Sequence, residues 1–129
     1  MRELPSEALG RIAEYFQALA EPTRLQILNF LRDGERRVGD IAEHCGCTAA
    51  NISRHLALLS KQGLVARAGR GTSVYYSISD PAIGALCALV CDRIACRLMD
   101  MAKEGEAFRR APEAGAGASH ATPPVLPVS

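Results

Sequence analysis

The fold is decided by the stretch VGDIAEHCGCTAANISRHLALLSKQ, residues 38–62. Its apolar spacing predicts a short helix over residues 38–45, followed by a second helix that Thr48 caps and that ends at Gly63. Gly46, which lies between the two, can adopt the left-handed backbone that a tight corner needs. Two helices joined by a short turn that contains glycine are typical of the helix-turn-helix motif.

The sequence that follows adds a β-hairpin to this motif. Residues 64–68 and 73–79 are rich in strand-forming side chains, and two glycines lie among the four residues between them, Gly69 to Thr72. This pattern predicts two strands joined by a tight turn. A helix-turn-helix followed by a hairpin indicates a winged helix far more specifically than either part alone.

Helical spacing extends the prediction in both directions along the chain. It indicates a helix over residues 6–20 with Ser6 as its N-cap, and another over residues 25–31. A last helix starts at Pro81 and runs to about Glu106. The predicted fold class is therefore mainly α with a small β-hairpin, a winged helix-turn-helix of four helices, two strands and a fifth helix.

The length of 129 residues fits one domain with tails. We expect a flexible N-terminus over residues 1–5, the winged helix-turn-helix domain over residues 6–108, and a disordered tail over residues 109–129. No apolar run approaches the roughly 18 residues of a membrane span, and no secretory signal begins the chain. A cytoplasmic protein is expected, whose five cysteines, an odd number, are thiols rather than a disulfide framework.

The charge is informative through its distribution. Residues 48–79 contain four basic and no acidic side chains, whereas the rest of the chain holds eleven basic and fourteen acidic ones. A locally positive segment favours an anionic partner such as double-stranded DNA. The alternative is a chance run of basic residues on a solvated face.

The helix-turn-helix indicates which side chains would contact DNA. Its second helix enters the major groove N-terminus first, and the free N–H groups at that end favour a phosphate. Asn suits adenine and Arg suits guanine, each through two hydrogen bonds, while hairpin arginines reach phosphates or the minor groove. An ordinary solvated surface is the alternative for each residue. The candidate contacts are Thr48, Asn51, Ser53, Arg54, His55, Arg67 and Arg70.

Several segments resemble a known family. The stretch FQALAEPTRLQIL at residues 16–28 is similar to the entry signature of the ArsR/SmtB winged-helix repressors, and so are VGDIA at 38–42, SRHL at 53–56 and VYY at 74–76. The resemblance covers about Leu9 to Met99. It implies a homodimer through the first and last helices that binds operator DNA at a promoter. It also implies release by an effector, often a metal or metalloid.

The metal-binding positions of that family are only partly present. Where one pattern has cysteine, before the Val-Gly-Asp, this chain has Glu35-Arg36-Arg37. A second pattern on the last helix matches at Asp80, but its other three positions are Ala82, Arg93 and Cys96. Since arginine is no ligand for a cation, the resemblance does not carry over a zinc site of this type.

The five thiols remain as candidate effector ligands. Cys87 and Cys91 are four residues apart and share a helical face, with Cys96 as a third candidate and Cys45 and Cys47 as weaker ones. Thiolates favour soft ions, and As(III) or Sb(III) takes three sulfurs. At about 100° per residue, Cys96 points roughly 180° from Cys87, so a third ligand must come from elsewhere. The effector is therefore expected to be arsenite, antimonite or another thiophilic ion, with no obligatory cofactor.

Other interpretations stay open for these residues. Free cysteine is also a small buried hydrophobe, and Cys87 and Cys91 lie on the apolar stripe of their helix. Another interpretation is a repressor switched by thiol chemistry, such as a disulfide or persulfide between Cys87 and Cys91. A further one is a repressor whose effector ignores cysteine, or that has no effector. The chain has no phosphate-binding glycine loop, no Gly-x-Ser-x-Gly and no His-Glu-x-x-His, so we expect no enzyme. A protein-binding winged helix is the remaining alternative class.

Overall fold

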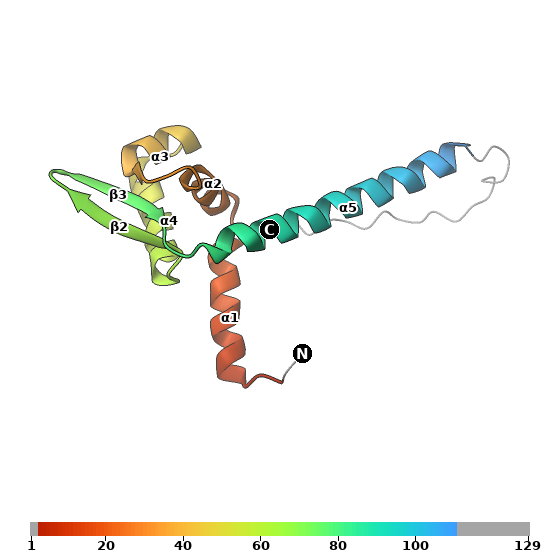
Figure 1. The fold of residues 1–129 in the computed structure, drawn as a ribbon, viewed down its shortest axis with the longest axis horizontal. Coiled ribbons are helices and arrows are strands. Elements are labelled where there is room, and N and C mark those ends of the chain that lie inside the picture. Colours follow the sequence, from red (N-terminus) through yellow and green to blue (C-terminus); the bar gives the residue numbers. More distant parts are fainter. Residues whose placement is uncertain (1–2, 111–129) are drawn as a thin grey trace. The chain divides into compact units, whose positions relative to one another are not determined.

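The computed structural model describes residues 3–110 and shows a mainly helical fold with a small sheet (Figure 1). Its elements in chain order are α1 Ser6–Leu19, α2 Pro22–Leu31, β1 Arg36–Arg37, α3 Val38–Cys45, α4 Ala49–Lys61, β2 Val65–Arg70, β3 Ser73–Ile78 and α5 Ala82–Arg110. The predicted fold class is confirmed, with one short strand more than predicted. One compact unit ends at Ile83, and a second begins at Gly84.

The helix-turn-helix forms as the sequence predicts. Gly46 ends α3 in the left-handed conformation with φ of +65°, and the backbone N–H of Cys47 donates to the carbonyl of Ala42 at 3.0 Å. Thr48 then caps α4, because its Oγ1 accepts a hydrogen bond from the backbone N–H of Asn51 at 3.1 Å. Both corners are therefore set by local chemistry that was readable in the sequence.

The core of the first unit lies between the helices and the sheet. α4 contributes Ile52, Leu56 and Leu59, each with no exposed surface. Burying such a side chain stabilises the fold by about 1.5–3 kcal/mol, so the apolar ridge fixes which face of α4 points outward. The remaining buried apolar residues are Ala18, Ile27, Leu28, Leu31, Ile41, Ala42, Leu64, Val65 and Ile83.

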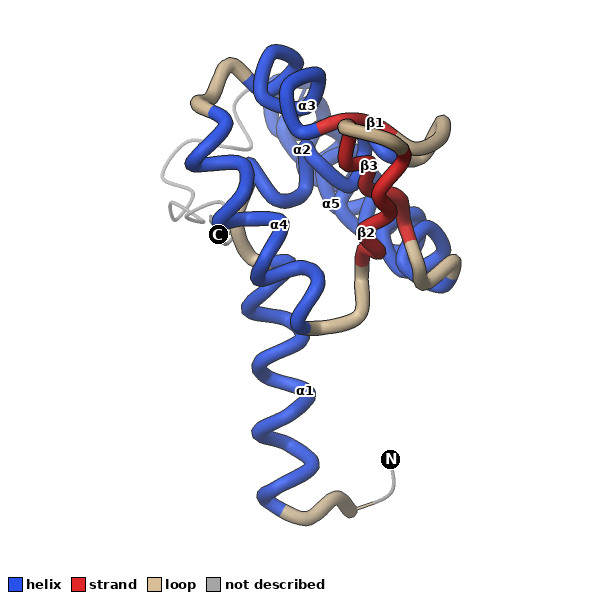
Figure 2. Tube along the Cα trace, turned by 90° about the vertical axis from the view of Figure 1, so that its left-hand side faces the viewer, coloured by secondary structure: helices blue, strands red, loops and turns tan. Residues whose placement is uncertain are grey.

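The sheet has three antiparallel strands in the order β1-β3-β2 (Figure 2). The sequence missed β1, since two residues are too few to show an alternating pattern; they pair with Tyr76 and Tyr75 of β3. The four-residue turn predicted at Gly69 to Thr72 was wrong. Arg70 pairs with Ser73, which leaves a two-residue turn whose Gly71 has φ of +62°. The backbone twist of two-residue hairpin turns matches the twist of the flanking strands. The shorter turn adds two residue pairs, Gly69 with Val74 and Arg70 with Ser73, to the predicted pairing of β2 with β3.

Several helix boundaries differ from the prediction by one to four residues; α2, for example, begins at Pro22 rather than at residue 25. Pro5, not Ser6, occupies the N-cap of α1, and it offers no side-chain hydrogen bond. α5 continues past Glu106 to Arg110, because the Glu106 carboxylate forms ion pairs with Arg109 at 3.3 Å and Arg110 at 3.0 Å one turn later. The tail predicted for residues 109–129 therefore starts no earlier than 111, and 111–129 lie outside the described residues.

α5 differs from the other helices in how little of it is buried. Among the 29 residues of α5, Ile83 is the buried one; Leu86 and Met101 are half-buried, and the other large apolar side chains are exposed. These exposed side chains are Leu89, Val90, Ile94, Leu98, Met99 and Phe108. No helix among residues 3–110 is both long and apolar enough to span a bilayer.

Candidate nucleic-acid interface

The outward face of α4 carries a linked pair of polar side chains. Ser53 and Arg54 are exposed, and Asn51 is half-buried beside them. The guanidinium Nη2 of Arg54 donates to the Asn51 Oδ1 at 3.0 Å. The remaining N–H groups of the pair face outward, where they can donate to acceptors on base edges or phosphates. The structure thus brings together two of the predicted DNA contacts.

The N-terminus of α4 lies one turn before this pair. The N–H groups in the first turn of a helix have no partner within the helix and favour anions. The Thr48 hydroxyl already accepts from Asn51. A phosphate at this end would therefore be bound by first-turn N–H groups and by the Thr48 hydroxyl as a donor.

The hairpin does not present its two arginines to the same side. Arg67 and Arg70 are three positions apart in β2, so their side chains leave opposite faces of the strand. Arg70 forms an ion pair with Glu35, and its guanidinium carbon lies 5.5 Å from the centre of the Tyr75 ring. A DNA backbone on one side of the hairpin can therefore be contacted by only one of these two arginines. If that arginine is Arg70, it must exchange its ion pair with Glu35 for one with a phosphate.

His55 is placed differently from the other polar residues of α4. Its side chain is only 16% exposed, and its Nδ1 lies 3.2 Å from Nη1 of Arg24 and 3.8 Å from Oε2 of Glu21. The sequence expected it to face away from the apolar ridge with its neighbours. The structure instead packs one edge of the imidazole against α2.

Glu21 and Arg24 were missed as site residues because they lie far from α4 in the sequence. Glu21 is the N-cap of α2, and its Oε2 accepts from the backbone N–H of Arg24 at 2.9 Å. Burial acts to raise the pKa of Glu21, but this hydrogen bond and nearby positive groups outweigh it and hold the pKa below its ordinary value. An acidic residue directly before Pro22 was the available signal for this cap.

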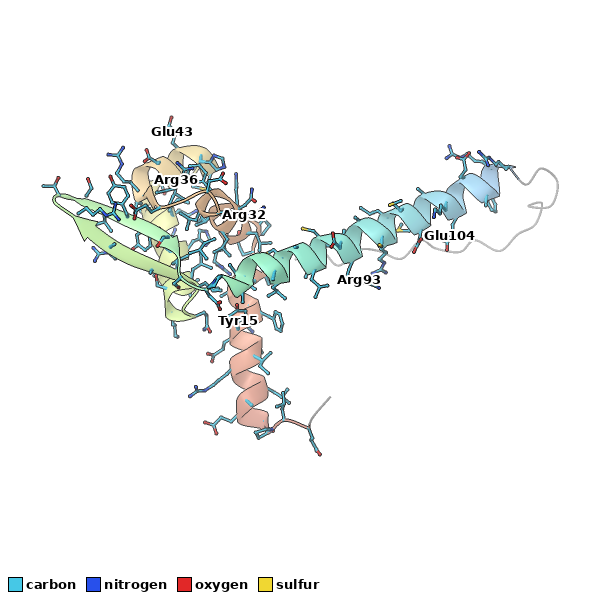
Figure 3. All side chains as sticks on the ribbon, in the orientation of Figure 1. Tyr15, Arg32, Arg36, Glu43, Arg93 and Glu104 are labelled. Carbon is cyan, nitrogen blue, oxygen red and sulfur yellow. The ribbon has the colours of Figure 1, made fainter. Side chains whose placement is uncertain are left out.

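The segment before α3 makes structural contacts where the resemblance places a cysteine ligand. Glu35 holds Arg70, and the guanidinium carbon of Arg36, labelled in Figure 3, lies 4.6 Å from the centre of the Phe30 ring. Phe30 in turn stacks on His44 with ring centroids 4.0 Å apart. These side chains connect the sheet to α2 and α3. None of the three residues before α3, Glu35, Arg36 and Arg37, is a thiol.

The two cysteines of the helix-turn-helix are half-buried, and the surroundings of Cys45 disfavour its thiolate. Burial, and secondarily the neighbouring Cys47, raise the pKa of the Cys45 thiol. Cys47 itself donates from Sγ to the Cys45 carbonyl at 3.5 Å. Since the thiolate is the metal ligand, this pair is disfavoured as a soft-metal site.

The three cysteines of α5 are free thiols, and two of them are more accessible than those of the helix-turn-helix. Cys87 is half-buried, whereas Cys91 and Cys96 are exposed. Cys87 and Cys91 are one helical turn apart, as the spacing predicted. Over residues 3–110, no three His, Cys, Asp or Glu side chains come together in a way that would hold a metal ion. One copy of this part of the chain therefore holds no preformed three-coordinate site.

Comparisons with known proteins agree with this architecture. The family described as "Bacterial regulatory protein, arsR family" matches residues 21–67. A probable mercury resistance operon repressor of Streptomyces lividans is 37% identical over 84 residues, which are 65% of this chain and 67% of that protein. The HTH-type transcriptional regulator NmtR of Mycobacterium tuberculosis is 40% identical over 83 residues, 64% of this chain and 69% of that protein.

A solved structure extends the similarity to the whole fold. The homodimeric winged helix-turn-helix DNA-binding domain of a possible ArsR-family regulator from Mycobacterium bovis superposes with a TM-score of 0.64 at 35% identity. The match covers 74% of this chain and 91% of that one. These relatives are named as regulators of transcription rather than enzymes, as the sequence predicted. The chain belongs to the ArsR family of bacterial transcription regulators, whose winged helix-turn-helix domains bind DNA.

Proposed function

We propose that this protein is a cytoplasmic, homodimeric repressor that binds operator DNA and leaves it when a thiophilic ion binds cysteines of α5. The observation that carries the DNA half is the outward face of α4, where Arg54 and Asn51 are joined by a hydrogen bond. The segment from 48 to 79, which includes both this face and the hairpin, holds no acidic residue. Double-stranded DNA is the polyanion that such a surface fits.

The dimer is supported by apolar side chains that α1 and α5 leave exposed. Leu9, Phe16 and Leu25 are 38–53% exposed in the first unit, and Leu89 and Met99 on α5 are 60–61% exposed. Contiguous exposed apolar surface marks an interaction site. The similar Mycobacterium bovis domain is described as homodimeric. A second copy of this chain is therefore the proposed cover for these side chains.

DNA binding is tested with a duplex that the unmodified protein selects from a randomised pool. Arg54→Ala should weaken binding to this duplex about tenfold to a hundredfold, because an arginine that reads a base discriminates by about 1–3 kcal/mol. Arg32→Ala is the matched control: Arg32, labelled in Figure 3, is equally exposed but lies on α2 and bonds to Asn29 at 3.4 Å. Equal affinity of the two variants would remove α4 as the reading helix and favour a protein-binding winged helix.

The effector half of the proposal is supported by the spacing and exposure of Cys87 and Cys91. A pair of thiolates one turn apart can share a soft ion, and As(III) or Sb(III) would take its third sulfur from a second copy of the chain or another element. Cys96 of the second copy is the candidate third thiol, because within one regular helix Cys96 points away from Cys87. The relative from Streptomyces lividans is named for mercury resistance, which fits a thiophilic effector.

Release is tested by titrating the protein–duplex complex with arsenite, antimonite, Cd(II) and polysulfide. Cys87→Ser combined with Cys91→Ser should abolish release by the active agent, whereas Cys47→Ser, a thiol outside α5, should leave it intact. Release by polysulfide alone would favour persulfide sensing at the same pair. If the double variant releases DNA like the unmodified protein, the pair has no part in the response.

A further inference from the structure

The contact between His55 and Arg24 joins α4 to α2. Nη1 of Arg24 lies 3.2 Å from the Nδ1 of His55, and the His55 side chain is 16% exposed. Arg54, the preceding residue of the same helix, is fully outside this contact and points its guanidinium at Asn51. Two adjacent residues of α4 are thus in different surroundings, one facing outward and one held by protein.

Arg24 also binds the end of α1. Its Nε donates to the carbonyl of Ala18 at 2.7 Å, and its Nη2 donates to the carbonyl of Gln17 at 3.0 Å. The last carbonyls of a helix have no partner from the following helical turn, and the bond from Arg24 satisfies that of Ala18. The Gln17 carbonyl accepts both from Arg24 and from the backbone N–H of Ala20 at 3.2 Å. One planar guanidinium therefore connects the C-terminal turn of α1 to His55 of α4.

The chemistry of the contact fixes the direction of its hydrogen bond. A guanidinium can only donate, so the Nδ1 of His55 is the acceptor. Glu21 and Arg24 are the charged groups that face this ring, and Oε2 of Glu21 lies 3.8 Å from the same nitrogen. That carboxylate already accepts from the backbone N–H of Arg24 at 2.9 Å and helps to keep this residue in place.

We infer that Arg24 and His55 are a positioning pair that fixes the recognition helix against the junction of α1 and α2, with His55 acting through Nδ1. This inference rests on the proposed DNA-binding function. Base recognition requires the reading side chains to be held within about 0.5 Å of their productive geometry. Asn51 and Arg54 lie within one turn of His55, so a shift of α4 at this contact displaces them directly.

The two ring nitrogens can be separated by two conservative substitutions. In His55→Asn, the amide Oδ1 lies where Nδ1 lay and can accept from Arg24, but nothing replaces Nε2. In His55→Gln, the longer side chain places its polar end near the former Nε2 and leaves Arg24 without this acceptor. Helix propensity favours Gln over Asn. A positioning role predicts the opposite order, with tighter DNA binding by His55→Asn than by His55→Gln, so propensity alone cannot produce the expected result.

Both variants are measured by fluorescence anisotropy with the duplex selected by the unmodified protein. His55→Asn should bind within about twofold of the unmodified protein, and His55→Gln should bind about tenfold more weakly, as expected for loss of a hydrogen bond to a charged group. The loss should be uniform over duplexes with single base-pair changes, because a positioning residue reads no base. Retention by Gln with loss by Asn would overturn the inference and assign His55 to DNA contact through Nε2. Equal binding by both variants would overturn it too.

A double-mutant cycle tests the pair itself. Arg24→Gln should weaken binding at least as much as His55→Gln, because it also removes the bonds to the carbonyls of Ala18 and Gln17. The double variant should bind no more weakly than Arg24→Gln alone, since the contact with His55 is already lost in that variant. Additive losses would show that the two residues act independently and would overturn the inference.

Failure of the proposed function is recognised separately. If the unmodified protein selects no duplex, the same variants are compared by hydrogen exchange of the α4 amides. Faster exchange in His55→Gln than in His55→Asn supports the positioning contact without DNA, and equal exchange overturns it.

Discussion

α4 and α5 both carry an apolar ridge, but in the described residues only the ridge of α4 is buried by the chain itself. Ile52, Leu56 and Leu59 of α4 are fully buried within the first unit, whereas Ile94 and Leu98 of α5 are 43% and 47% exposed. The apolar face of α4 is satisfied by its own fold, so its polar face is left for a ligand. The apolar face of α5 still needs a partner. The difference supports the proposals that α4 reads DNA and that α5 takes part in dimer assembly.

The largest expected effect comes from charging the α5 ridge. Ile94→Glu combined with Leu98→Glu should halve the mass in solution and weaken duplex binding about a hundredfold, since two linked half-sites bind far more tightly than one. Sedimentation and anisotropy measure the two effects. Arg93→Glu combined with Arg97→Glu alters charge on the same turns at polar positions and should keep the dimer. If the variant with Ile94→Glu and Leu98→Glu remained dimeric, the exposed ridge of α5 would not be the dimer contact.

The α4 ridge should respond in stability rather than assembly. Leu56→Ala should lower the free energy of unfolding by about 2–5 kcal/mol, because it leaves a cavity in a packed core. Leu58→Ala is the matched control on the same helix, where the side chain is 47% exposed, and it should cost less than about 1 kcal/mol. Urea unfolding followed by circular dichroism measures both. Equal losses in the two variants would contradict the burial of the α4 ridge in a packed core.

A smaller effect is expected where the hairpin meets the loop before β1. Glu35 holds Arg70 in the free protein, so Glu35→Gln should release the arginine for phosphate and raise duplex affinity by about twofold to fivefold, the range of a surface ion pair. The slope of affinity against salt concentration should steepen by up to about one ion. Asp33→Asn removes the same charge from the same loop as a control. Weaker or unchanged binding by Glu35→Gln would mean that Arg70 does not reach DNA.

The smallest effect concerns the cap of α2. The pKa of Glu21 is lower in the folded chain than in the unfolded one, so its contribution is present above its ordinary value of 4.5 and is lost as the pH falls through the folded pKa. Glu21→Gln should therefore cost about 0.5–1 kcal/mol at pH 7 and nothing in acid. Urea midpoints at both pH values measure this, with Glu43→Gln, an exposed carboxylate of α3, as control. A pH-independent difference would contradict it.

Local pattern in the sequence determined the elements and their corners. The 3.6-residue spacing, Gly46 and Thr48 predicted α3 and α4 with their bounds, and the glycines predicted a hairpin. The candidate DNA contacts and the thiol pair followed from the same spacing, because residues a few positions apart on a helix have fixed relative directions. Two-residue β1, the length of the turn and the N-cap of α1 depended on pairing and geometry that no local pattern reveals.

Tertiary structure alone decided which of these polar residues have protein partners. Arg24 lies 31 positions from His55, and Glu35 lies 35 positions from Arg70, yet each pair is in contact. Contacts between distant segments depend on how whole elements pack, and packing is set by the summed burial of the core rather than by any short stretch. The sequence by itself therefore determined which side chains are candidates for DNA contact. Only the folded chain decided which other groups hold these side chains in place.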